Sequence, residues 1–173
     1  MTENLVTIDK ISFKNIPQLV KMHHDPSIYT FDPDTVKVIN EEIARKYIQK
    51  AHKTWKEGTT YIFSVYNQNK EFVGFITLRN IVKNSHAKIG FAITKDHRRK
   101  GYVTAAIQKI IEYAKDVLEL KVVEASVHKD NIRSQKALIK NGFLRIDRKN
   151  CIGKFKKDLN YEILQIKIEL PRK

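Results

Sequence analysis

Apolar side chains recur every three or four residues between positions 103 and 118, and this period constrains the fold more than any other feature of the chain. Its members are Val103, Ala106, Ile107, Ile110, Ile111, Ala114, Val117 and Leu118. Such spacing places them on one face of a helix. Stretches rich in β-branched and aromatic residues, which are typical of strands, flank it at 86–94 and 121–127. The chain therefore predicts a strand, a long helix and a second strand in succession.

The other segments also show either a helical or a strand period. Asn40 and Asn131 are placed as helix N-caps, and Gly142 follows the last turn of a helix. The further predicted helices are 14–22, 40–56 and 131–141, and the further strands are 5–13, 60–66, 72–79, 143–148 and 161–170. The order is β-α-α-β-β-β-α-β-α-β-β, with hairpins as well as crossovers. We therefore expect an α/β (α+β) fold with a mixed sheet, and an all-parallel doubly wound sheet is disfavoured.

Length and composition limit the number of domains, the membrane segments and the disulfides that the chain can have. With 173 residues, of which 42% are apolar, the chain is long enough for a single domain, 1–173, around its own core. No apolar stretch reaches the roughly 18–20 residues that cross a membrane, and the first ten residues lack the pattern of a signal peptide. Cys151 is the only cysteine, so no disulfide can form within the chain. We expect a cytoplasmic location.

The formal net charge of +14 favours acidic partners such as nucleic acid, a phosphorylated cofactor or anionic lipid. Lysine is nevertheless spread along the whole chain, and net charge alone indicates only non-specific association. Proximity to RNA or to the ribosome is therefore one interpretation, beside a cofactor site and a surface that is merely basic.

The strongest local concentration of charge is HRRKGYVT, residues 97–104, between a predicted strand and the long helix. A helix N-terminus exposes about four N–H groups without partners and carries about half a positive charge. Gly101 allows a ligand to approach the backbone without a Cβ in the way, and Arg98, Arg99 and Lys100 raise the local positive potential. These features suit a diphosphate, although a solvated basic loop explains them too. Neither the P-loop spacing nor the GxGxxG spacing is present.

Arg98-x-x-Gly101-x-Val103 resembles the Gln/Arg-x-x-Gly-x-Gly/Ala motif of the GCN5-related N-acetyltransferases, the GNAT superfamily. The segments IGFAITKDHRRKGYVTAA and NIRSQKALIKNGF are similar to the ribosomal-protein N-terminal (alanine/serine) acetyltransferase branch. Matching positions are Gly90-Phe91, Gly101-Tyr102-Val103-Thr104, Asn131, Ser134 and Gly142-Phe143. The segment that carries these matching positions covers about residues 86–145. It implies the GNAT fold, with a mixed, mostly antiparallel central sheet of about six to seven strands flanked by about four helices.

The resemblance implies acetyl-coenzyme A as the co-substrate. Its diphosphate would bind the loop amides, and its pantetheine arm would bind main-chain groups of the preceding strand and the side chain of Asn131. The implied cofactor-binding residues are Phe91, Ala92, Ile93, Arg98, Arg99, Lys100, Gly101, Tyr102, Val103, Thr104, Asn131 and Ser134. No metal site is predicted, because His23, His24 and Asp25 lack a third His or Cys at ligand spacing.

Acetyl transfer to an amine requires a neutral amine and a hydrogen-bond donor for the oxyanion of the intermediate. The departing thiolate also benefits from a proton donor. Leu138 occupies the position where many superfamily members carry a tyrosine acid, and the resemblance makes Ser134 the candidate acid instead. Related enzymes often carry a glutamate base where this chain has Lys88. Glu124 and His86 are weak substitutes for that base, and none is assigned.

The predicted function is acetyl-coenzyme A-dependent N-acetylation of a primary amine, on a protein N-terminus or on a small molecule. No motif identifies the acceptor. Its predicted walls are the loop 24–35 and the segment 150–160. Lys154, Lys156 and Lys157 in the second wall suit an acidic or RNA-associated acceptor, or else belong to a solvated hairpin.

Two other functions stay open at this point. The first is a coenzyme A sensor without turnover, which Leu138 and Lys88 would explain. The second is a basic module that binds nucleic acid or the ribosome, although no known recognition motif of that kind is present. We expect a monomer, or a homodimer if the strand 161–170 lies at an edge of the sheet.

Overall fold

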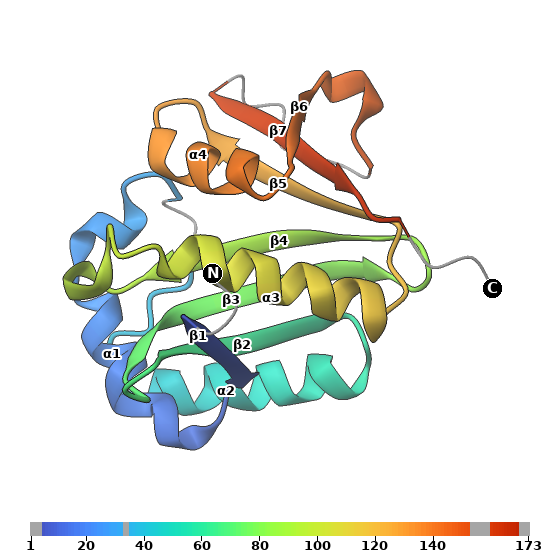
Figure 1. Cartoon of the computed structure of the whole chain (residues 1–173). Helices are drawn as coiled ribbons and strands as arrows, with labels where there is room; N and C mark the ends of the chain where they lie inside the picture. The colour runs from blue at the N-terminus through green and yellow to red at the C-terminus, as the bar shows by residue number, and fades with distance from the viewer. Residues whose placement is uncertain (1–4, 33–34, 153–159, 170–173) are drawn as a thin grey trace.

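The computed structural model describes residues 5–32, 35–152 and 160–169 (Figure 1). The order of its helices and strands is the predicted order. The strands are β1 Val6–Lys10, β2 Thr60–Asn67, β3 Phe72–Val82, β4 His86–Ile93, β5 Val122–His128, β6 Leu144–Ile146 and β7 Tyr161–Lys167. The α-helices are α1 Ile16–His23, α2 Glu41–Lys56, α3 Tyr102–Asp116 and α4 Ile132–Lys140. None of these described helices is long and apolar enough to span a bilayer.

The seven described strands form one sheet in the order β1-β2-β3-β4-β5-β7-β6. Neighbouring strands are antiparallel except for β4 and β5, which are parallel. The expectation of a mixed, mostly antiparallel sheet is therefore confirmed. In contrast, β7 lies inside the described sheet, between β5 and β6. The edge position that would let this strand pair with a second copy is not found, because its two sides already bind neighbours.

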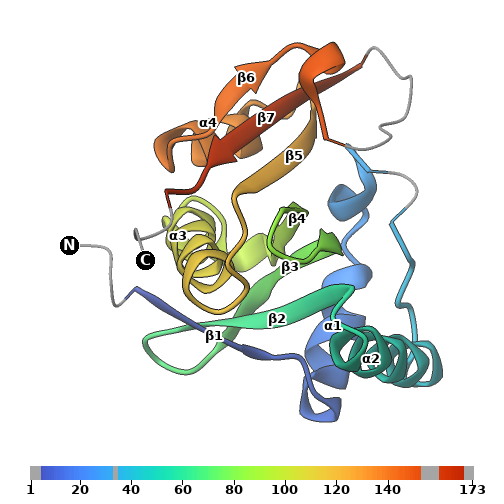
Figure 2. The same ribbon diagram turned by 90° about the vertical axis from the view of Figure 1, so that its right-hand side faces the viewer.

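Helices cover both faces of the sheet, with α1 and α2 on one side and α3 and α4 on the other (Figure 2). Ile107 of α3 and Leu138 of α4 are completely buried in the larger core cluster. Leu19 of α1 and Ile48 of α2 are completely buried in the smaller one. Each such side chain contributes about 1.5–3 kcal/mol by leaving water, so hydrophobic burial holds the two helix layers to the sheet.

Local capping explains where the helices begin and end. Asn40 Oδ1 accepts from the N–H of Ile43 at 2.9 Å, and Asn131 Oδ1 accepts from the N–H of Ser134 at 3.3 Å. Gly142 follows α4 with a φ of 85°, a left-handed conformation that favours glycine. The three predicted caps are confirmed.

Four short 3₁₀ turns lie between the described helices and strands, and one of them, Arg148–Asn150, begins where the strand 143–148 was predicted to end. The first strand is shorter than expected, because the turn Phe13–Asn15 follows it. The loop after α1 contains the turn Pro26–Tyr29 (η2), which Asp25 caps by accepting from the N–H of Ser27. The turn Lys95–His97 (η3) separates β4 from the basic motif.

β4 and β5 pair along three residues only, His86–Lys88 with Val122–Glu124. Beyond these pairs, β4 continues to Ile93 and β5 to His128, and the two strands diverge (Figure 1). We call this opening the fork. Because β4 and β5 are parallel, the helices that follow them, α3 and α4, both begin at its open end.

Candidate functional site

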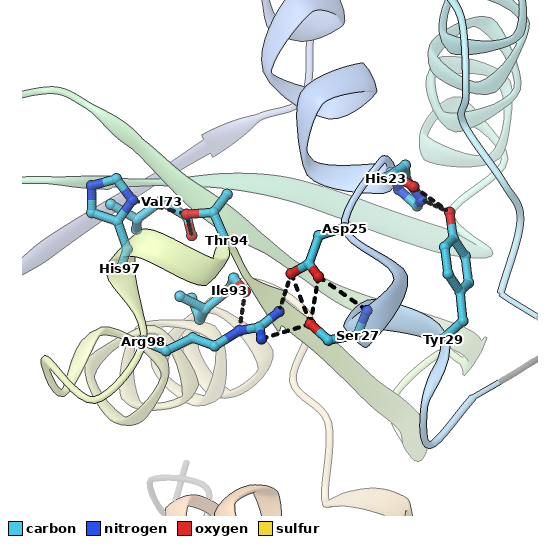
Figure 3. A network of polar contacts seen from close by, with 9 residues as sticks. All are labelled: His23, Asp25, Ser27, Tyr29, Val73, Ile93, Thr94, His97 and Arg98. Atoms are coloured by element: carbon cyan, nitrogen blue, oxygen red, sulfur yellow. Dashed lines mark hydrogen bonds and ion pairs between the residues drawn. The ribbon is translucent and has the colours of Figure 1, made fainter.

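The loop from β4 to α3 is anchored to the sheet before it turns into the helix (Figure 3). The N–H of Thr94 donates to the carbonyl of Val73 at 2.9 Å, and Thr94 Oγ1 lies 2.8 Å from His97 Nδ1. Arg99 and Gly101 then adopt left-handed φ values of 62° and 79°. Glycine adopts such a φ without steric cost, so the chain can reverse sharply at the start of α3.

Six consecutive N–H groups, from Arg99 to Thr104, donate to no acceptor in the described part of the chain. The first main-chain bond of α3 runs from Ala105 N to Gly101 O at 3.1 Å. A Cβ added at Gly101 would meet one neighbouring atom, a methyl carbon of Leu5 at 3.4 Å. Unpaired N–H groups at a helix N-terminus attract an anion, and Lys100 is exposed beside them. The loop therefore fits a diphosphate in its donors and in its open space.

The last residues of β4 expose main-chain groups along the fork. Phe91, Ala92 and Ile93 pair with β3 on one side, and in the described sheet no strand lies on their other side. Alternate N–H and C=O groups of this edge can bind an extended ligand, apart from the Ile93 carbonyl, which accepts from Arg98 Nε. The carbonyl of Ala92 also approaches Gly74 of β3, where a Cβ would lie only 2.1 Å from it. Sequence reasoning missed Gly74, although a glycine inside a strand indicates such a close approach.

Arg98 directs its guanidinium toward the segment that follows α1 (Figure 3). Nε donates to the carbonyl of Ile93 at 3.1 Å, Nη1 to Ser27 Oγ at 2.8 Å and Nη2 to Asp25 Oδ2 at 2.9 Å. Desolvation alone would raise the pKa of Asp25, but hydrogen bonds from Ser27 and the charges of Arg98 and Lys95 lower it. The Arg98 charge, predicted from the sequence to raise the potential of the loop, is thus paired with a carboxylate.

Glu124 lies at the closed end of the fork, directly opposite Lys88 on the neighbouring strand. It is completely buried, and Oε1 accepts from Gln165 Nε2 at 2.7 Å and from the N–H of Ile152 at 2.8 Å. Oε2 is buried and has no hydrogen-bond partner among the described residues. Burial lowers the pKa of Lys88, and the charge of Arg79 adds to this effect, while Glu124 opposes it. Glu124 is therefore a buried carboxylate with one oxygen unpaired among the described residues, at the level where β4 and β5 separate.

Ser126 and His128 follow Glu124 on the same face of β5, since alternate residues of a strand share a face. The ring of His128 lies 5.5 Å from that of Phe31 and 5.3 Å from that of Tyr161. A row of polar residues therefore leads from the buried carboxylate to an aromatic cluster at the outer end of β5. Sequence reasoning missed Ser126 and His128, although the alternation in VVEASVH was the available signal.

The remaining candidates occupy different places. Asn131 caps α4 and Ser134 lies in its first turn, at the open end of the fork, and both are partly buried. His86 lies in the paired part of β4, two residues farther from the opening than Lys88, and its Nδ1 is 3.0 Å from Ser85 Oγ. Leu138, at the position of the family's tyrosine, is completely buried.

Two further expectations concern metal and the acceptor walls. Within the described ranges, no three His, Cys, Asp or Glu residues lie close enough together to hold a metal ion. Lys154, Lys156 and Lys157, together with Pro33 and Asp34 of the other wall, lie outside the described residues.

Residues 6–144, most of the chain, match the acetyltransferase (GNAT) domain family. The chain belongs to the GNAT family. The predicted resemblance is thereby confirmed, and the loop before α3, the fork and the last residues of β4 are parts of a GNAT domain.

Sequence relatives match the GNAT domain in part. The uncharacterized N-acetyltransferase p20 of Bacillus licheniformis is 32% identical over 118 residues, which are 64% of this chain and 66% of p20. The matched segments also span less than two thirds of two Bacillus subtilis relatives, 37% of YjdG and 61% of YjcK.

Solved structures match the GNAT domain more completely. RimJ of Mycobacterium smegmatis, in complex with CoA-disulfide, has a TM-score of 0.81 at 16% identity, covering 96% of this chain and 83% of RimJ. Spermidine N-acetyltransferase of Vibrio cholerae, in complex with CoA and spermine, has a TM-score of 0.75 at 15% identity. The match covers 94% of this chain and 95% of the Vibrio cholerae chain. These similarities confirm the predicted GNAT fold.

Proposed function

We propose that this chain is an N-acetyltransferase that transfers acetyl from acetyl-coenzyme A directly to a primary amine. The observation that carries the proposal is the run of six N–H groups at the start of α3 that have no acceptor among the described residues, open above Gly101. Family membership supports it, as do the CoA ligands of the two solved relatives. We take residues 1–173 as one acetyltransferase domain.

The proposed co-substrate site runs from the loop along the fork. The diphosphate accepts hydrogen bonds from the loop amides, beside the exposed side chains of Arg99 and Lys100. Arg98 contributes through its main chain, because its guanidinium is bound to Asp25. The pantetheine arm lies along the open edge of β4. The full proposed set is Phe91, Ala92, Ile93, Arg98, Arg99, Lys100, Gly101, Tyr102, Val103, Thr104, Asn131 and Ser134.

The reaction needs a route for the proton of the amine, because α-amino groups have a pKa near 8 and lysine side chains near 10.4. We assign this proton to Glu124 Oε2, which is buried at the closed end of the fork and accepts no hydrogen bond from the residues that the structure describes. Ser126 and His128 lie on the same face and lead toward solvent. Ser134, in the first turn of α4, is the proposed donor to the departing thiolate. His86 is the weaker alternative as base, because among the three paired residues of β4 it lies farthest from the opening.

The acceptor is a primary amine on a protein N-terminus or a small molecule. The same fold occurs in RimJ and in a spermidine N-acetyltransferase, so both acceptor classes belong in the assay. Thiol release from acetyl-coenzyme A should be measured with N-terminal peptides of ribosomal proteins, polyamines, amino acids and antibiotic amines. Turnover on one group would identify the acceptor class. CoA binding without turnover on any of them would favour the coenzyme A sensor.

Gly101→Asp tests the co-substrate site directly. The new carboxylate and Cβ would face the diphosphate, so we expect CoA affinity, measured by calorimetry, to fall about 100-fold or more. Gly58→Asp is the matched control, because Gly58 has a similar φ of 70° and its Cβ would meet only the Tyr61 hydroxyl, at 3.8 Å. Equal CoA affinity in wild type and Gly101→Asp would refute the proposed site.

A further inference from the structure

The segment 25–31, which we call the strap, connects the two arms of the fork. At one end Asp25 and Ser27 bind Arg98, which follows β4. At the other end the carbonyl of Phe31 accepts from the Tyr161 hydroxyl at 2.8 Å, and the Phe31 ring packs against His128, the last residue of β5. The strap therefore reaches from the end of β4 to the end of β5.

Arg98 connects the strap to the sheet as well as to the loop (Figure 3). One guanidinium binds three oxygens on two separate segments, the Ile93 carbonyl of β4 and the side chains of Asp25 and Ser27. The Arg98 and Asp25 side chains are 28% and 16% exposed, so water screens this ion pair less than one at an open surface. Ser27 in turn donates to Asp25, which closes the network.

We propose that Arg98 is a positioning residue that couples the co-substrate loop to the acceptor side of the fork. This inference rests on the proposed function. The main chain of Arg98 belongs to the loop that would bind the diphosphate, while its side chain holds the strap. A diphosphate that orders the loop therefore also orders the strap, and an acceptor that orders the strap favours co-substrate binding by the same factor.

Two substitutions separate this coupling from simple loop stability. Asp25→Asn keeps the size of the side chain and the cap of η2, because Asn caps a helix as well as Asp does, but it removes the charge that holds Arg98. Arg98→Lys keeps the positive charge but loses the planar group that reaches three oxygens. Lys95→Gln is the control, because Lys95 contributes a nearby positive charge and its side chain donates no hydrogen bond among the described residues.

Amide hydrogen exchange across residues 25–31, with and without saturating CoA, measures the coupling without a known acceptor. We expect CoA to slow exchange in the strap of the wild type and of Lys95→Gln by about fivefold or more. In Asp25→Asn we expect CoA to leave the exchange rate of the strap unchanged. The affinity for CoA should stay within about fivefold of the wild type, because a lost coupling can lower affinity only by the coupling factor itself. Arg98→Lys should lose the same protection at saturating CoA.

The possible failures are distinguishable. A wild type that binds CoA with no change in strap exchange would overturn the coupling alone. Equal protection in the wild type and in Asp25→Asn would do the same. A wild type that binds no CoA would overturn the proposed function, and this inference with it.

Discussion

Among single residues, Glu124 carries the most specific chemical expectation. The resemblance implies a glutamate at the position of Lys88 on β4, and in this chain a buried carboxylate lies directly opposite, on β5. A carboxyl group thus lies at the level of Lys88, on the neighbouring strand. Lys88 lies next to it with a pKa that burial lowers.

Glu124→Gln should keep the fold and remove the proposed base. The amide oxygen can still accept from the N–H of Ile152, so we expect kcat to fall about 100-fold, within the usual range for a general base, with little change in CoA affinity. Steady-state kinetics across pH checks this. Glu162→Gln on β7, which loses an exposed pair with Arg145, should leave kcat unchanged. Wild-type kcat in Glu124→Gln would exclude the role.

For whole elements, the chain offers a matched pair of helices capped by asparagine. Asn40 begins α2, away from the fork, and Asn131 begins α4, at its open end. Asn40→Ala and Asn131→Ala should each lower the free energy of unfolding by about 1 kcal/mol, since each removes a cap. Only Asn131→Ala should also weaken CoA binding. Denaturant titrations combined with calorimetry test both, and a CoA defect in Asn40→Ala would contradict the assignment.

The elements themselves were largely predictable, because their signals are local. The apolar period of α3, the caps at Asn40 and Asn131 and the glycine after α4 depend on residues within a few positions of one another. The length of the β4–β5 pairing was not predictable, because the same apolar stretch would suit a fully paired strand. The partners of Arg98 were not predictable either, since they lie 71 and 73 positions away.

At the scale of the whole molecule, a buried histidine links stability to pH. His23 is 4% exposed and stacks on Phe75, and its Nδ1 lies 2.9 Å from the hydroxyl of Tyr29, which donates to the His23 carbonyl. Burial lowers its pKa below 6.5, so the unfolded chain takes up the proton more readily. The contribution of His23 to the free energy of unfolding is therefore complete above pH 6.5 and decreases as pH falls from there toward the lowered pKa.

Urea titrations between pH 7.5 and 5 would measure this dependence. We expect a steeper loss of stability in the wild type than in His23→Gln, which removes the titrating ring. Equal slopes in the two proteins would show that His23 does not contribute to the pH dependence.

The Ala92 carbonyl lies so close to Gly74 that it limits which residues position 74 can hold. Any side chain at position 74 would push β4 away from β3, and the shape of the fork depends on β4. A library randomised at every glycine and selected for acetylation should therefore retain glycine at 74, while position 58, where a Cβ meets one atom at 3.8 Å, accepts asparagine and aspartate.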